Sequence, residues 1–147
     1  LSAKTSAATD RYHELSDQIK AAEKRMAEIA VLRSHIINYA KTRDVYVAYR
    51  KAGYSKKFKA EHEAEILLHQ AAKSFFNESG LKKLPTIKSL QAEYAALLAE
   101  KKTAYADYRK AREEMKELLT VQANVDRLMG YDEQKRQQEA VSQEEHR

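Results

Sequence analysis

One segment of the sequence concentrates residue types that bind polyanions. The stretch YVAYRKAGYSKKF, residues 46–58, interleaves aromatic rings with arginine and lysine and contains no acid. Around its start, two tyrosines and two arginines recur at intervals of four, three and four residues, which is the spacing of one helix face: Tyr39, Arg43, Tyr46 and Arg50. Guanidinium groups bind phosphates through paired hydrogen bonds, and tyrosine rings stack on exposed bases. The pattern therefore predicts contact with nucleic acid.

The candidate contact residues fall into two chemical groups. Six cations are candidates for binding phosphate oxygens: Arg43, Arg50, Lys51, Lys56, Lys57 and Lys59. Three tyrosines are candidates for contacting sugars or bases: Tyr46, Tyr49 and Tyr54. In the alternative interpretation, the tyrosines continue the apolar face of Leu32 and Ile36 into a packed seam, and the cations form its solvated rim. A basic patch alone does not decide between the two.

The positive charge of the chain is local. The whole sequence has a net charge of +5. Residues 31–60 hold eight basic residues and one acid, Asp44, whereas acids outnumber bases in residues 121–147. A local block of cations attracts and orients polyanions, so the distribution supports the same segment as a binding site.

No catalytic or metal-binding pattern competes with this segment. His62, Glu65 and His69 are spaced three and four residues apart, but their order differs from the His-Glu-x-x-His pattern of zinc enzymes. A polar helix face is the better interpretation of these three residues. The sequence also contains no nucleophile–base set and no glycine-rich phosphate loop. We therefore expect no catalytic residues, no metal site and no cofactor.

Composition and punctuation predict an all-α fold. The 147 residues include only three glycines and one proline, and 33% are charged, which is typical of long helices and coiled coils. We expect helices at about residues 10–52, 56–77 and 87–129. Glycine closes helices at little steric cost, and serine or threonine caps their starts. The predicted stops and caps are Gly53, Gly80, Gly130, Ser55 and Thr86.

The first and third predicted helices have matched lengths, which predicts a long antiparallel hairpin resembling a coiled coil. The first helix has an apolar seam with heptad spacing: Tyr12, Leu15, Ile19, Ala22, Met26 and Ile29. The numbers of facing residues should add to about 139, which places Met26 near Met115 and Leu15 near Val125. The short second helix should fold over the closed end, with five residues inward: Phe58, Leu68, Ala72, Phe75 and Phe76.

The domain organisation is predicted to be one helical domain, residues 1–130, followed by a polar tail, residues 131–147, that is either a frayed helix or disordered. The seam of the third helix continues to its end: Ala104, Tyr108, Ala111, Met115, Leu118, Gln122, Val125 and Met129. Because the distal half of the hairpin has no third helix to cover it, a homodimer is a fair hypothesis. No apolar run in the sequence is long enough to span a bilayer. The absence of cysteine is compatible with a cytoplasmic protein. The start of the sequence suggests part of a longer protein.

Two stretches of the sequence resemble a known family. Residues 29–76 and 81–119 are similar to the C-terminal helical region of relaxases, the mobilisation nucleases of conjugative transposons in Gram-positive gut bacteria. The string YRKAGYSKKF, residues 49–58, is the most distinctive part of the resemblance. Such relaxases nick one DNA strand at an origin of transfer, using a tyrosine nucleophile and a histidine-held metal in an N-terminal domain.

The resemblance implies a role without chemistry for this chain. The sequence has no His-x-His pair, and none of its nine tyrosines matches the nucleophile of the family. The resemblance therefore implies a non-catalytic accessory region that holds origin-of-transfer DNA or docks relaxosome accessory proteins. The alternative is a protein–protein interaction or dimerisation module that does not bind nucleic acid.

Overall fold

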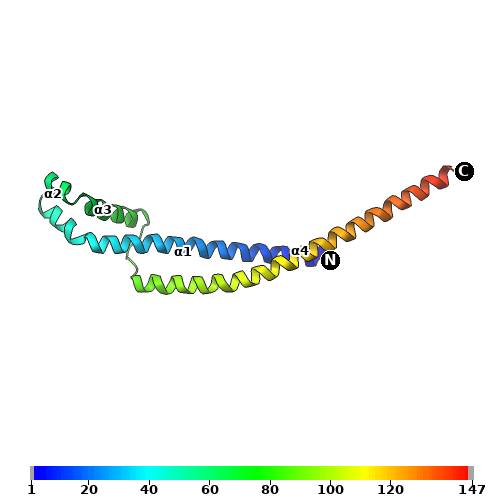
Figure 1. The fold of residues 1–147 in the computed structure, drawn as a ribbon, viewed down its shortest axis with the longest axis horizontal. Helices are drawn as coiled ribbons and strands as arrows, with labels where there is room; N and C mark the ends of the chain where they lie inside the picture. Colours follow the sequence, from blue (N-terminus) through cyan, green and yellow to red (C-terminus); the bar gives the residue numbers. More distant parts are fainter. Residues whose placement is uncertain (1, 146–147) are drawn as a thin grey trace. The chain divides into compact units, whose positions relative to one another are not determined.

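The computed structural model describes residues 2–145, which form an all-α structure (Figure 1). Its helices are α1 (Ser2–Lys51), α2 (Lys56–Glu61), α3 (Glu63–Glu78) and α4 (Ile87–Glu145). No strand occurs within residues 2–145. The predicted fold class is confirmed, and α1 packs against α4 as the helical hairpin requires.

Most of the predicted helix boundaries are confirmed. Gly53 and Gly80 have φ angles of 67° and 66°, the left-handed conformation that ends a helix. The Ser55 hydroxyl accepts a hydrogen bond from the backbone N–H of Phe58 at 3.4 Å, and so caps α2. The Thr86 hydroxyl accepts one from the backbone N–H of Ser89 at 3.0 Å and caps α4 in the same way.

Three boundaries differ from the prediction. Helix α1 begins at Ser2 rather than near residue 10. Gly130 does not stop α4, which continues to Glu145, so most of the polar tail is helical. One exposed glycine costs a helix about 1 kcal/mol, which is too little to end a helix of 59 residues. The predicted second helix is interrupted at His62, whose φ of −127° and ψ of 29° are not helical.

The contacts of the chain define two compact units, where the sequence predicts one domain. The first, here called the two-helix unit, comprises residues 2–20 of α1 and the described residues of α4 from 101 onward. The second, here called the α3-containing unit, spans Ala21–Glu100 and includes the turns on both sides of α3. Each unit has its own apolar core.

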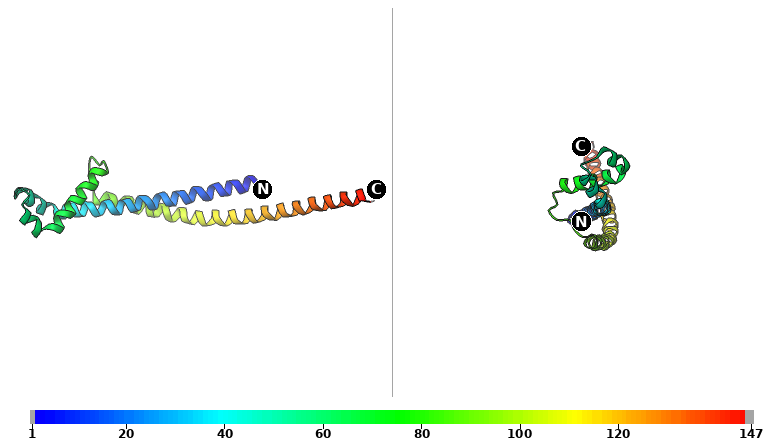
Figure 2. Two further views of the ribbon diagram at one scale, coloured as in Figure 1. Left: turned by 90° about the horizontal axis from the view of Figure 1, so that it is seen from above. Right: turned by 90° about the vertical axis from the view of Figure 1, so that its left-hand side faces the viewer.

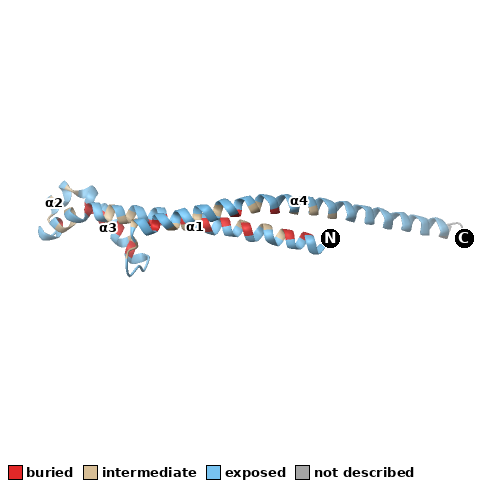
Figure 3. Ribbon diagram, turned by 90° about the horizontal axis from the view of Figure 1, so that it is seen from below, coloured by how far each residue is buried: buried red, intermediate tan, exposed pale blue. Residues whose placement is uncertain are grey.

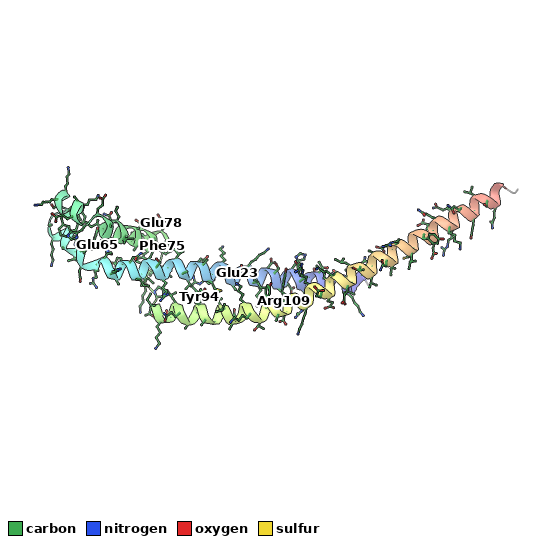
Figure 4. The ribbon with its side chains drawn as sticks, in the orientation of Figure 1. Glu23, Glu65, Phe75, Glu78, Tyr94 and Arg109 are labelled. Atoms are coloured by element: carbon green, nitrogen blue, oxygen red, sulfur yellow. The ribbon has the colours of Figure 1, made fainter. Side chains whose placement is uncertain are left out.

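The core of the α3-containing unit lies where α1, α3 and α4 meet. Helix α3 packs across the C-terminal part of α1 (Figure 1 and Figure 2). Phe75 of α3 lies between the two helices and stacks on His35 of α1 with ring centroids 4.3 Å apart (Figure 4). Five buried residues form the core: Ile29, Leu32, Ala72, Phe76 and Leu90. Leu68, predicted to point inward, is 45% exposed.

The predicted register of α1 against α4 is wrong. In the two-helix unit the hydroxyls of Tyr12 and Tyr108 are 3.2 Å apart, and in the α3-containing unit Arg25 pairs with Glu93. Within each pair the two residue numbers add to about 120, whereas the predicted register requires 139. Met26 therefore does not face Met115, and Leu15 does not face Val125. Because α3 packs across α1 instead of covering its end, α4 begins about 20 residues earlier along α1, or roughly 30 Å.

The predicted seams of α1 and α4 are buried where the two helices lie side by side. In the two-helix unit, four buried residues form the core: Leu15, Ile19, Ala104 and Ala111. The six seam residues of α1 are buried or half-buried, as predicted. Burial then fades along α4: Val125 is 38% exposed and Met129 is 65% exposed. The C-terminal part of α4 is exposed on all sides in the described structure (Figure 3).

Candidate nucleic-acid interface

The predicted cations lie at the end of α1 and in α2. Arg50 and Lys51 form the last turn of α1, and Lys56, Lys57 and Lys59 belong to α2. We call these five residues the basic segment. Arg43 lies two turns earlier on α1. All six cations are exposed, and none makes a salt bridge with any residue that the structure describes. Their charges are therefore available to an anionic ligand.

Helix electrostatics explains only some of these cations. The C-terminal end of a helix attracts positive charge, so Arg50 and Lys51 stabilise α1 where they are. Lys56 and Lys57 lie in the first turn of α2, where the helix dipole opposes positive charge, and no acid accompanies them there. Helix stability does not account for these two lysines, which favours a role in binding.

Two of the three candidate tyrosines are used in packing. The ring of Tyr46 is half-buried and stacks on His69 with centroids 4.2 Å apart. Tyr49 is only 7% exposed, and its ring lies parallel to that of Phe58 at 6.1 Å. These two rings behave as the packed seam that the sequence leaves open as an alternative.

Tyr54 is the accessible tyrosine of the three. It is 54% exposed and its ring meets Tyr49 edge-on at 5.3 Å. Its φ is 59°, a left-handed conformation that costs a residue with a side chain roughly 1–2 kcal/mol. The turn is nevertheless closed by a hydrogen bond of 3.1 Å from the Tyr54 N–H to the Tyr49 carbonyl oxygen. The strained turn thus presents one aromatic ring among the lysines.

An aromatic chain holds α2 in place. Phe58 of α2 lies beside Tyr49 of α1, and its ring also contacts that of His62 at a tilt of 34°, with centroids 4.6 Å apart. His62 follows α2 directly and precedes α3. The three lysines of α2 are therefore positioned between the end of α1 and the start of α3.

The two histidines considered as metal ligands, His62 and His69, lie in different surroundings. The ring of His62 contacts that of Phe58 at a tilt, whereas His69 is 3% exposed and packs between tyrosines of α1. Glu65 is exposed on α3 (Figure 4). Among the side chains that the structure describes, those of residues 2–143, no three from histidine, aspartate or glutamate are arranged to hold a metal ion.

His69 is a core residue that the sequence analysis assigned to a polar face. The buried residues of α3 recur at intervals of three, three and four, and His69 is one of them: Ile66, His69, Ala72 and Phe76. That spacing was present in the sequence and would have placed the histidine on the buried face.

A groove in the α3-containing unit has a volume of about 370 Å³. Tyr94 of α4 lines it (Figure 4), together with Ile29, Ala30, Arg33, Leu90 and Gln91. The lining has one cation and no acid, histidine or hydroxyl nucleophile other than the tyrosine. The groove therefore offers no acid–base pair for catalysis.

Comparisons with models of known protein families, with characterised proteins and with solved structures find no match to this chain. None of the helices in the described part of the chain is both long and apolar enough to cross a membrane.

Proposed function

We propose that this chain is a non-catalytic accessory region of a conjugative relaxase, and that it binds DNA near the origin of transfer through its basic segment. The observation that supports this most is the group of exposed cations without salt-bridge partners, which includes two lysines that helix α2 itself disfavours. The similarity of residues 49–58 to the relaxase region supports the same assignment. DNA transfer would place the protein in the cytoplasm, beside the accessory proteins of a relaxosome.

In this proposal, binding is mainly electrostatic. Lysines and arginines replace the counterions of the DNA backbone, and the released counterions drive association. Arg43 and the basic segment contact phosphates, and Tyr54 contacts a sugar or a base. Tyr46 and Tyr49 act indirectly, because their packing fixes the end of α1 and the position of α2.

A charge-reversal variant tests the proposal. Replacing Lys56, Lys57 and Lys59 with glutamate should weaken binding to a labelled origin-of-transfer duplex at least tenfold, measured by fluorescence anisotropy at low salt. Circular dichroism should show unchanged helicity, since these side chains are exposed.

The matched control makes the same charge change elsewhere. Lys110, Lys116 and Lys135 are exposed lysines of α4, and their replacement with glutamate should reduce affinity far less. Absence of binding by the unmodified chain, or equal losses in both triple variants, would contradict the proposal.

A second candidate function is dimerisation, and one specific observation favours it. The seam of α4 continues with the same spacing beyond its packed part, yet Val125 and Met129 are 38% and 65% exposed, and Leu128, which flanks the seam beside Met129, is 65% exposed. A second copy could cover this apolar face. In this candidate the basic segment has no part in the assembly.

Sedimentation equilibrium separates the two candidates. If α4 dimerises, replacing Leu128 with lysine should shift the chain to monomer, whereas the same change at exposed Val141 should not. A monomer at high concentration would reject this candidate and leave DNA binding untouched. Ile19 and Met26 are unsuitable for this test, because both are buried within the chain itself.

A further inference from the structure

His69 is a buried histidine enclosed by aromatic rings. It belongs to α3 and is 3% exposed. Its ring stacks between Tyr39 and Tyr46 of α1, with centroid distances of 4.6 and 4.2 Å and interplanar angles of 21° and 16°. The imidazole therefore lies at the centre of the contact between α3 and the C-terminal part of α1.

The hydrogen bonds around His69 assign its proton. The hydroxyl of Thr42 donates its single proton to the carbonyl oxygen of Asn38 at 2.7 Å. The same hydroxyl oxygen lies 3.0 Å from Nδ1 of His69, so it accepts a hydrogen bond from Nδ1–H. The neutral ring thus makes this bond, and a further proton would bind at Nε2 and give the buried ring a positive charge.

The surroundings of His69 disfavour that charge. Burial lowers the pKa of His69 below its usual 6.5, and the positive charge of Lys73, one turn later on α3, lowers it further. From α1, the ring faces two neutral tyrosines, whose ring faces attract cations, and a backbone contact with Tyr39 raises the pKa by the smallest contribution. No carboxylate in the described chain contributes, and Glu65, one turn earlier on α3, is exposed.

We propose that His69 makes the packing of α3 on α1 sensitive to pH. Neutral His69 holds the two helices together, and protonation below pH 6.5 loosens α3. Because α3 follows α2 after a single residue, loosening α3 also releases the support of α2 and its three lysines. That last step rests on the proposed DNA binding, whereas the pH-dependent packing does not.

The sign of the effect follows from the lowered pKa. The unfolded chain takes up the proton at about pH 6.5, before the folded chain does. The contribution of His69 to stability is therefore complete above pH 6.5 and is lost as the pH falls through the folded pKa. At a pH below the folded pKa, the folding equilibrium constant is lower than at neutral pH by about tenfold for each pH unit that separates the folded pKa from 6.5.

NMR titration of the unmodified chain tests the proposal directly. We expect the imidazole resonances of His69 to titrate with a midpoint below 6.5, together with shifts in the backbone amides of α3 and of residues 39–46. A midpoint at or above 6.5, or titration without any change in those amides, would overturn it.

A variant gives an independent test. In His69→Phe the stacking partner is kept and the titrating group is lost, while the Thr42 hydroxyl retains its bond to Asn38. The thermal midpoint should fall less between pH 8 and pH 5 in this variant than in the unmodified chain. The same change at exposed His13 should leave the pH dependence as it was. Equal pH dependence in all three proteins would contradict the proposal.

DNA binding provides a readout that separates the two proposals. At fixed salt, the unmodified chain should lose affinity for the duplex between pH 7.5 and pH 5.5 in excess of the loss in His69→Phe. If neither protein binds at pH 7.5, the proposed function fails while the NMR result on His69 stands. If both bind at pH 7.5 and weaken equally, the link from His69 to the basic segment fails.

Discussion

The two units of this protein differ in how completely their helices bury apolar side chains. In the α3-containing unit, where a third helix packs on the pair, Ile66 and Ala72 are 0% exposed and Leu90 is 2% exposed. In the two-helix unit, the most buried residues, Ala104 and Ala111, are 3% exposed, and the larger core side chains of Leu15 and Ile19 are 8% exposed each. Two helices bury only a narrow stripe of each other, and a third helix closes one of the open sides.

The two units also differ in the kind of side chain that each leaves exposed for binding. The α3-containing unit buries the rings of Tyr49, Phe76 and His69, and it leaves the cations of the basic segment exposed. The two-helix unit has the most exposed large apolar side chains of the described chain, Leu128 and Met129 of α4, which are each 65% exposed. The first pattern suits a rigid support for a charged surface, and the second suits a face that pairs with another helix.

The largest expected effect comes from one substitution made at both kinds of site. Leu90→Ala removes a side chain from the core of the α3-containing unit and should lower the free energy of unfolding by about 2–5 kcal/mol. Leu128→Ala, at a residue that is 65% exposed in the two-helix unit, should change it by less than about 0.5 kcal/mol. Urea denaturation at low protein concentration measures both. Similar losses would show that the contrast in burial between the two sites has no energetic counterpart.

A smaller effect should distinguish the two ends of the basic segment. Replacing Lys56 and Lys57 with glutamate puts acids in the first turn of α2 and should stabilise the chain, by about 0.3–1 kcal/mol per residue at most. The same change at Arg50 and Lys51, in the last turn of α1, should destabilise it by a similar amount. Thermal unfolding at low ionic strength detects the opposite signs. Two changes of equal sign would remove the argument that helix stability does not explain Lys56 and Lys57.

The smallest expected effect concerns the salt bridge between α1 and α4. Arg25 donates two hydrogen bonds to Glu93, at 2.7 and 3.1 Å, and holds the pKa of that carboxyl below its usual 4.5. The stabilisation is present above pH 4.5 and is lost as the pH falls through the folded pKa of Glu93. Both side chains are about 40% exposed, so Glu93→Gln should cost less than about 1 kcal/mol at pH 7.

The control for this substitution is the same measurement in acid. As the pH is lowered through the folded pKa of Glu93, the carboxyl takes up a proton in the unmodified chain, so the cost of Glu93→Gln in urea denaturation should shrink. A cost that stays constant down to about pH 2 would assign the stabilisation to packing rather than to the ion pair.

Local signals in the sequence predicted the helices well. The heptad spacing from Tyr12 to Ile29 identified the buried seam of α1, because one face of a helix follows directly from the order of its residues. Gly53, Gly80, Ser55 and Thr86 act as predicted, since each determines the backbone only within a turn of itself.

The register of α1 against α4 and the burial of the candidate tyrosines could not be predicted from such local signals. Both depend on where α3 packs, and a helix of 16 residues with an apolar face can lie across a partner or cover its end. Because α3 packs across α1, it encloses the ring of Tyr46 and leaves that of Tyr54 exposed. Helix α4 then starts beside a point on α1 that is nearer to the N-terminus of α1 than predicted. Among the candidate site residues, the exposed cations lie where the sequence analysis placed them, at the end of α1 and after it.

The measurement that tests the central claim most directly is the salt dependence of DNA binding. If the basic segment neutralises about five phosphates, the logarithm of the association constant should fall with the logarithm of salt concentration at a slope of about −4 to −5. The slope should become shallower in the Lys56, Lys57 and Lys59 charge-reversal variant. A flat salt dependence in the unmodified chain, or no binding at low salt, would contradict the account.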